Sequence, residues 1–232
     1  MKNGKKIIVS MTSWKKRIQH VSKTIYMMER QSLVPDKIIL NLSTDEFPNK
    51  EKELPNDLIM LSETLDNFEI FWVKSNTRAF KKFIPTLGRF FEENCWILTV
   101  DDDYFYNKDY ISMMVDMAEK HYPNCITPGI CGLHPHGYAM IYSPDMFRNK
   151  SIFNITVSEM NTIIASDNWI QAALLSNGYN FIKVKEICNY ITPIERGNRL
   201  GAYYASRIQG IKRKEFIKNK MKSIGYTINF PN

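Results

Sequence analysis

The sequence predicts a single α/β domain in which a mainly parallel sheet is sandwiched between helices. Short, continuously apolar segments alternate with segments whose apolar residues recur at helical spacing. Strands that are apolar on both faces are typical of parallel sheets covered by helices on each side. With 232 residues the chain is long enough to bury a continuous core, and it has no apolar run of the roughly 20 residues that a membrane-spanning helix needs.

The expected elements follow one another along the chain, with strands at 6–11, 37–42, 69–73 and 95–100 and helical spacing over 18–28, 54–65, 80–91 and 110–119. Pro35 breaks the chain before the second strand, Pro55 marks the start of a helix, and Pro85 interrupts the stretch 80–91. The second half is less regular, with a Pro- and Gly-rich stretch at 123–137, strands at 138–142 and 181–187, and helices at 167–176 and 201–222.

The net charge of +7 is concentrated near the C-terminus. Between Arg196 and Lys222 there are nine Lys or Arg residues and only Glu215 as an acid, so this segment carries +8 and the rest about −1. We therefore expect a domain over 1–195 and a basic, helical extension over 196–232 packed on or beside it. Basic residues that follow one another like this commonly form a solvated helix face. The alternative is that they attract the segment to an anionic membrane surface. No recognisable nucleic-acid module accompanies the charge, so nucleic acid is not expected as a partner.

The N-terminus and the cysteines indicate a cytoplasmic protein. The basic start, 1–6, is followed by only three apolar residues, too few for a signal peptide. Cys95, Cys125, Cys131 and Cys188 show no metal-type spacing, and a core of this size needs no disulfides, so reduced thiols are expected. The localisation is predicted as cytoplasmic, with peripheral contact at the inner face of the membrane as an option for the basic segment.

Three adjacent carboxylates, Asp101, Asp102 and Asp103, end the strand at 95–100. In an open α/β sheet, ligands bind beyond the carboxyl ends of the strands. Like charges this close raise one another's pKa unless a cation neutralises them, and hard oxygen ligands suit Mg²⁺ or Mn²⁺. An exposed acidic turn that caps the next helix is the simpler alternative, but three acids after a buried strand favour a metal site.

Basic residues are expected at the same edge of the sheet. The segment 76–82 follows the third strand and contains Arg78, Lys81 and Lys82. Arg and Lys beside a carboxylate-bound metal form a suitable diphosphate cradle, although for either lysine alone an ordinary helix face is equally expected.

Two further segments carry groups that could act in chemistry. Asp167, before a helical stretch, is either an N-cap or a base that takes a proton from an acceptor hydroxyl, and spacing alone favours the cap. His134 and His136 flank Pro135 and lack the i, i+4 spacing of a zinc motif, so a loop role is expected. The sequence has no Gly-rich phosphate loop and no GxSxG or GxGxxG motif.

Six segments occur together in an order that is specific as a set: 8–18, 31–43, 80–87, 99–103, 141–144 and 166–169. In these segments, over about residues 6–185, the chain resembles a family of bacterial glycosyltransferases with a GT-A-like fold. That family is related to glycosyltransferase family 2 and is often found with surface-polysaccharide genes. The resemblance implies a GT-A-like (nucleotide-diphospho-sugar transferase) fold, an NDP-sugar donor, Mn²⁺ or Mg²⁺, and a saccharide or lipid-linked saccharide acceptor.

The resemblance also implies roles for individual positions. It assigns the metal to Asp101 and Asp103, the base of an inverting reaction to Asp167, and contacts with the nucleotide sugar to Thr12, Ser13, Arg17, Asn41, Arg78, Lys82, Asp101 and Asp102. Relatives usually carry paired acids before Trp169, whereas this chain has Asn168 as the second member of the pair.

Two other functions are weighed against this prediction. A nucleotidyltransferase that makes NDP-sugars would share the sheet and the metal, but the basic segment 12–17 lacks the glycines of its signature. A non-catalytic protein that binds carbohydrate or membrane would explain the basic tail and the 12% aromatic content. It gives no reason for the three adjacent aspartates.

Overall fold

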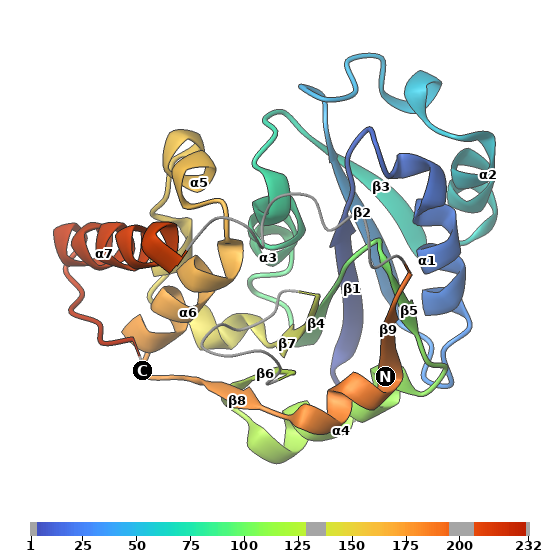
Figure 1. The fold of residues 1–232 in the computed structure, drawn as a ribbon. Helices are drawn as coiled ribbons and strands as arrows, with labels where there is room; N and C mark the ends of the chain where they lie inside the picture. The colour runs from blue at the N-terminus through green and yellow to red at the C-terminus, as the bar shows by residue number, and fades with distance from the viewer. Residues whose placement is uncertain (1–3, 129–137, 195–206, 231–232) are drawn as a thin grey trace.

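The computed structural model describes residues 4–128, 138–194 and 207–230, and the side chains of 207–211 are not described. A seven-stranded sheet forms its centre (Figure 1), in the order β3-β2-β1-β4-β7-β6-β8. Its strands are β1 (Lys6–Thr12), β2 (Lys37–Ser43), β3 (Phe68–Val73), β4 (Cys95–Val100), β6 (Cys125–Thr127), β7 (Ala139–Tyr142) and β8 (Phe181–Lys183). A second sheet pairs β5 (Tyr104–Tyr106) with β9 (Ile191–Pro193) in antiparallel fashion.

Helices cover both faces of the central sheet. They are α1 (Val21–Glu29), α2 (Asn56–Thr64), α3 (Ile84–Arg89), α4 (Tyr110–His121), α5 (Val157–Ile163), α6 (Ser166–Ser176) and α7 (Arg207–Ser223). In Figure 1, α1 and α2 lie on one side of the strands β1–β3 and α3 lies on the other. Helix α4 packs against β6 and β7.

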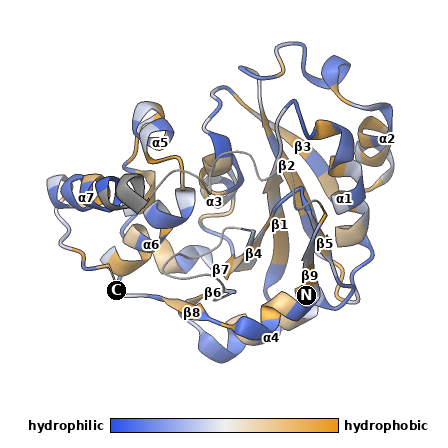
Figure 2. Cartoon of the chain, viewed as in Figure 1, coloured by the Kyte–Doolittle hydropathy of each residue, from blue (hydrophilic) through white to orange (hydrophobic). Residues whose placement is uncertain are grey.

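The sheet is mainly parallel, as the sequence predicts. Strands β3, β2, β1 and β4 run parallel, and β6 runs parallel to β8. Only β7 is antiparallel to its two neighbours, β4 and β6. All six residues of β4 are buried, which explains why this strand is apolar on both faces. Figure 2 shows the hydrophobic colouring concentrated along these strands and on the inner sides of the helices.

The structure corrects several expected boundaries. The strand predicted at 181–187 ends at Lys183, and a 3₁₀ helix, η6 (Lys185–Tyr190), follows it. The stretch 80–91 is split into a 3₁₀ helix, η3 (Arg78–Lys82), and α3. Pro85 explains the split, because proline lacks the N–H that a continuing helix would use and is accommodated in a first turn.

Among the strands and α-helices of the described residues, β5, β6, β9 and α5 were not expected from the sequence. Strands β5, β6 and β9 have three residues each, too few to show a period of two. Helix α5 does carry a local signal, since Thr156 and Glu159 form a capping box at its start.

Helix α7 packs against α5 and α6. Ile217 and Met221 are buried, and Lys220 Nζ lies 3.0 Å from the Glu159 carboxylate of α5. The helix was expected over 201–222, and residues 201–206 lie outside the described part of the chain. No helix in the described ranges combines the length and the apolar character needed to cross a membrane. Cys95 and Cys125 are free thiols, whereas Cys131 is not described.

Candidate functional site

The candidate site lies where the order of the strands reverses direction. From β1 the chain adds β2 and then β3 on one side, and it then returns to place β4 on the other side of β1. The carboxyl ends of β1 and β4 are therefore neighbours, and this is the position at which open α/β sheets bind their ligands. Ser13 follows the end of β1 and Asp101 follows the end of β4.

Asp102 joins these two strand ends. Ser13 Oγ donates a hydrogen bond of 2.5 Å to Asp102 Oδ2, and the guanidinium of Arg17 lies 2.8 Å from Asp102 Oδ1. The Asp102 side chain is almost completely buried. This burial raises the pKa of the Asp102 carboxyl to about 6, although Arg17 and Ser13 act in the opposite direction.

Arg17 and Lys82 bring positive charge to all three carboxylates. Arg17 contacts Asp103 Oδ2 at 2.5 Å in addition to its contact with Asp102. Lys82 Nζ donates to Asp101 Oδ1 and forms an ion pair with it. The structure therefore brings Ser13, Arg17 and Lys82 together around the acidic cluster 101–103, as expected for residues at one edge of the sheet.

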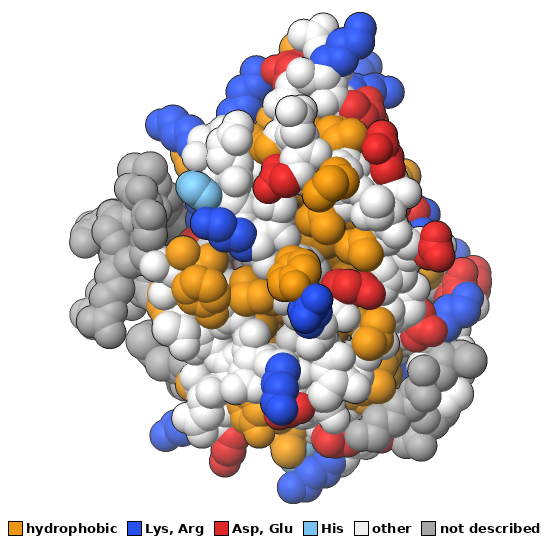
Figure 3. Space-filling model, turned by 90° about the vertical axis from the view of Figure 1, so that its right-hand side faces the viewer, with side chains coloured by type: hydrophobic (Ala, Val, Ile, Leu, Met, Phe, Trp, Pro, Cys, Tyr) orange, Lys and Arg blue, Asp and Glu red, His pale blue; other side chains and the backbone are white. Residues whose placement is uncertain are grey.

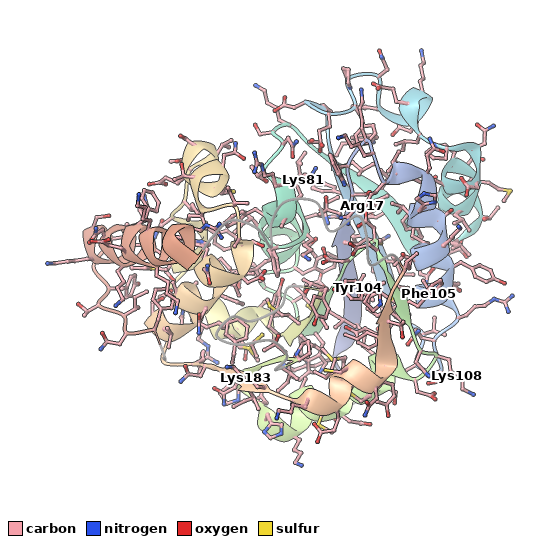
Figure 4. All side chains as sticks on the ribbon, in the orientation of Figure 1. Arg17, Lys81, Tyr104, Phe105, Lys108 and Lys183 are labelled. Atoms are coloured by element: carbon pink, nitrogen blue, oxygen red, sulfur yellow. The ribbon has the colours of Figure 1, made fainter. Side chains whose placement is uncertain are left out.

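Lys81 and Glu46 belong to the same site. Lys81 was named from the sequence as a candidate for the diphosphate cradle, whereas Glu46 was not selected. Lys81 Nζ pairs with the Glu46 carboxylate and donates to the carbonyl oxygen of Ser13 at 3.3 Å. Burial lowers the pKa of the Lys81 ammonium. Arg17 and Lys81 reach the site from the segments that follow β1 and β3 (Figure 4). The adjacent pair Lys81-Lys82 was noted in the sequence, yet nothing in it showed that both side chains are buried.

Asn41 and Thr12 lie in hydrogen-bond networks beneath the site. Asn41 is fully buried, and its Nδ2 donates to Ser10 Oγ (3.1 Å), to Met11 O (3.2 Å) and to Thr86 Oγ1 (3.1 Å). Thr12 Oγ1 donates to the carbonyl oxygen of Asn41 at 2.7 Å. These bonds fix the ends of β1 and β2 relative to α3. Direct contact of Asn41 or Thr12 with a nucleotide stays a prediction.

Tyr106 positions the backbone of the acidic cluster. Its hydroxyl accepts a hydrogen bond of 2.8 Å from the N–H of Asp101 and lies within donating distance of two carbonyl oxygens, Tyr138 O (3.1 Å) and Asp101 O (3.3 Å). Tyr104, two residues earlier on β5, stacks on Tyr138 with ring centroids 4.6 Å apart. The short strand β5 thus ties the chain just after the carboxylates to the start of β7.

Arg78 and Asp167 are the two remaining predicted residues. Arg78 is exposed at the start of η3, with a left-handed backbone (φ 54°). Asp167 is half-buried and is the second residue of α6, whose N-cap is Ala165, so the N-cap interpretation of Asp167 is wrong. His134 and His136 lie outside the described residues.

The carboxylates of the acidic cluster are oxygen ligands of the kind that divalent metal ions prefer. Asp103 Oδ1 is buried and has no hydrogen-bond partner within residues 4–128, 138–194 and 207–230. Over the same ranges, no three His, Cys, Asp or Glu side chains gather as a complete ligand set. Mg²⁺ and similar ions in proteins commonly take one or two carboxylates together with substrate phosphates and water. Asp101 and Asp103 fit that arrangement.

A shallow apolar hollow lies on a different face, between α1, α2 and β5. Tyr26, Met60 and Phe105 line it, and each of these residues is about half exposed. Figure 3, which views the α1 and α2 side of the molecule, shows apolar side chains gathered on this face.

Solved structures with the same fold include complexes with UDP, UDP-GlcNAc and GDP-Man. The chain is similar to Staphylococcus aureus TarS 1–349 in complex with UDP-GlcNAc, with a TM-score of 0.63 and 12% identity over 97% of this chain and 68% of that one. The complex of TarS 1–349 with UDP gives a TM-score of 0.54 and 13% identity over 78% and 58%.

It is also similar to the mannosyltransferase PcManGT from Pyrobaculum calidifontis in complex with GDP-Man and Mn²⁺, with a TM-score of 0.60 and 14% identity over 96% and 66%. The chain thus spans 58 to 68% of the length of the chains in these three structures. No family model and no curated protein sequence matches it. At these identities the likeness establishes the fold alone, which is the GT-A-like class that the sequence predicts.

Proposed function

We propose that this chain is a metal-dependent glycosyltransferase that moves a sugar from a nucleotide-diphosphate sugar to an acceptor hydroxyl. The observation that carries the proposal is the acidic cluster 101–103 at the switch point of a GT-A-like sheet, with Arg17 and Lys82 in contact with it. The structural neighbours that hold UDP, UDP-GlcNAc and GDP-Man support a nucleotide-sugar donor, and one of them also holds Mn²⁺.

The donor end of the reaction is assigned to the strand ends. Asp101 and Asp103 would hold Mn²⁺ or Mg²⁺, which supplies Lewis-acid neutralisation of the charge on the departing nucleoside diphosphate. Arg17, Arg78 and Lys82 bind the phosphate oxygens, where preorganised cations stabilise the developing negative charge. Five residues are assigned to contact with the nucleoside and to forming its pocket: Thr12, Ser13, Asn41, Asp101 and Asp102.

The acceptor end is assigned to α6. Asp167 removes the proton from the acceptor hydroxyl, whose oxygen then bonds to the anomeric carbon. The bond from that carbon to the diphosphate oxygen breaks, and its electron pair stays on the nucleoside diphosphate. Attack from the face opposite the leaving group inverts the anomeric configuration. We assign the product to bacterial surface polysaccharide, capsule or lipopolysaccharide, with a saccharide or lipid-linked saccharide as the acceptor.

A screen of NDP-sugars tests the reaction. Release of UDP or GDP from one donor is expected with Mn²⁺ or Mg²⁺ and not in EDTA, and it should rise when the acceptor is added. The matched variant is Asp103→Asn, which keeps the size of the side chain and removes the charge. Release of pyrophosphate from a nucleoside triphosphate and a sugar phosphate would instead identify a nucleotidyltransferase. Nucleotide binding that does not respond to the metal would contradict the proposal.

We place the enzyme in the cytoplasm, with the basic C-terminal segment in peripheral contact with the inner face of the membrane. Helix α7 has exposed Lys212, Lys218 and Lys222, and each Lys near an anionic surface contributes about 1 kcal/mol of binding. Co-sedimentation with vesicles that contain phosphatidylserine should be lost when these three residues are changed to Glu. The same charge change at the exposed residues Lys23, Lys52 and Lys74 is the control, and equal loss in both triple variants would contradict a specific role for α7.

A further inference from the structure

Arg17 holds two of the three carboxylates through separate nitrogens. One terminal nitrogen lies 2.8 Å from Asp102 Oδ1 and the other lies 2.5 Å from Asp103 Oδ2. The guanidinium thus bridges neighbouring acids, one of which is a proposed metal ligand. A divalent ion that shares the Asp103 carboxylate would lie beside a full positive charge, and like charges at this separation oppose each other's binding.

The two cations that pair with the acidic cluster differ in their freedom to move away. The Lys82 side chain is only 4% exposed and is enclosed beside Asp101, whereas the Arg17 side chain is 33% exposed. The backbone at Arg17 is anchored, because its N–H donates to Trp14 O at 2.9 Å and the following Ile18 is buried. Arg17 can therefore turn its guanidinium from a fixed backbone position, while a comparable movement of Lys82 would require repacking of its surroundings.

The charges of the site indicate where Arg17 goes. Three carboxylates face two cations, so the cluster 101–103 with its partners carries one net negative charge. A divalent ion reverses that sign, whereas the diphosphate that enters with it brings new negative oxygens. A guanidinium donates two parallel hydrogen bonds to phosphate oxygens as readily as to carboxylates.

We infer that Arg17 is an exchanging counter-ion: it neutralises Asp102 and Asp103 until the metal and the donor bind together, and it then transfers to the diphosphate. This inference rests on the proposed function and assigns Arg17 two successive partners. It predicts that Arg17 weakens the binding of the metal alone and strengthens the binding of the nucleotide in the presence of the metal. A residue that only stabilises the site structurally would strengthen both.

Mn²⁺ binding without nucleotide is the first measurement. The electron paramagnetic resonance signal of free Mn²⁺ gives the dissociation constant for the wild type and for Arg17→Ala. We expect Arg17→Ala to bind Mn²⁺ about tenfold more tightly, because the competing positive charge is gone. Arg89→Ala is the matched control, since Arg89 is also paired with a carboxylate, Glu69, and its removal should leave the Mn²⁺ affinity unchanged.

Nucleotide binding in saturating Mn²⁺ is the second measurement, by calorimetry with UDP and with GDP. Arg17→Ala should bind the nucleotide about tenfold more weakly than the wild type. Arg17→Gln, which keeps the length of the side chain without its charge, should show both effects if the smaller variant fails to fold. Mn²⁺ affinity that falls or is unchanged in both variants would overturn the exchange. Wild-type protein that binds neither nucleotide in Mn²⁺ would overturn the proposed function as well.

Discussion

The hydroxyl of Tyr106 should stabilise the protein, and the hydroxyl of its neighbour Tyr110 should not. The two rings pack together with centroids 4.8 Å apart, and both side chains are buried. Tyr106 accepts the N–H of Asp101 at 2.8 Å and contacts the carbonyl oxygen of Tyr138 at 3.1 Å. The hydroxyl of Tyr110 has no hydrogen-bond partner among the residues that the structure describes. Replacement of each tyrosine by phenylalanine removes one oxygen and leaves the ring in place.

The expected magnitudes follow from these partners. Tyr106→Phe leaves the N–H of Asp101 without its partner, and an unsatisfied buried polar group costs about 1–3 kcal/mol. For a chain of this length, a loss of about 2 kcal/mol lowers the melting temperature by roughly 4–8 °C. Tyr110→Phe removes a hydroxyl that is buried without a partner, so the free energy of unfolding should stay the same or rise by about 1 kcal/mol.

Urea unfolding and thermal scans of the three proteins, all in EDTA, measure these changes. The binding of UDP or GDP in Mn²⁺ should weaken in Tyr106→Phe, because the Asp101 backbone loses an anchor, and should be unchanged in Tyr110→Phe. Equal melting temperatures for the two variants would refute the reasoning, as would a Tyr106→Phe protein at least as stable as the wild type.

Three further outcomes concern the carboxylates. Asp103→Asn should lower metal-dependent release of the nucleoside diphosphate at least about 100-fold while the fold is retained; full activity would remove Asp103 from the metal site. Asp167→Asn should lower kcat about 100-fold or more with nucleotide affinity unchanged, and unchanged turnover would remove it as the base.

In EDTA, Asp102 should make stability depend on pH, because its pKa is about 6 in the folded chain and 3.8 as its ordinary value. The folded state holds this proton more tightly, so the Asp102 contribution falls by up to roughly 3 kcal/mol as the pH rises from about 4 to about 6. Asp102→Asn should lack this slope in urea unfolding, and identical slopes would contradict the assignment.

Most of the central sheet could be predicted from the sequence because its strands are buried on both faces. β1, β2 and β4 are buried along almost their whole length, each has a run of apolar residues, and the α/β fold with a mainly parallel sheet is confirmed. The strand expected at 138–142 is present as β7, but its antiparallel direction was not expected. That direction and the strands β5, β6 and β9 depend on long-range pairing, which leaves little trace in local patterns. The predicted end of β8 was wrong because the apolar residues up to Ile187 fit a strand and a 3₁₀ helix equally well.

The site was predicted in part. The cluster 101–103 is conspicuous because three adjacent acids follow a buried strand, and Arg17 and Lys82 do contact it. The hydrogen bond from Ser13 to Asp102 joins residues 89 positions apart, and only the topology of the sheet brings them together. The burial of Lys81 against Glu46 has no local signal either. The chemical roles of these residues stay predictions.

The position of β4 has a consequence for the way the chain folds during its synthesis. β1, β2 and β3 leave the ribosome first, yet the second edge of β1 pairs with β4, where Lys6 faces Cys95. Until that segment emerges, the nascent chain has an apolar strand with an open edge, which favours intermolecular pairing. Contacts between residues so distant in sequence also form slowly. The strand that closes this edge is followed directly by the three carboxylates, so closure of the sheet and assembly of the site are expected in a single late kinetic step.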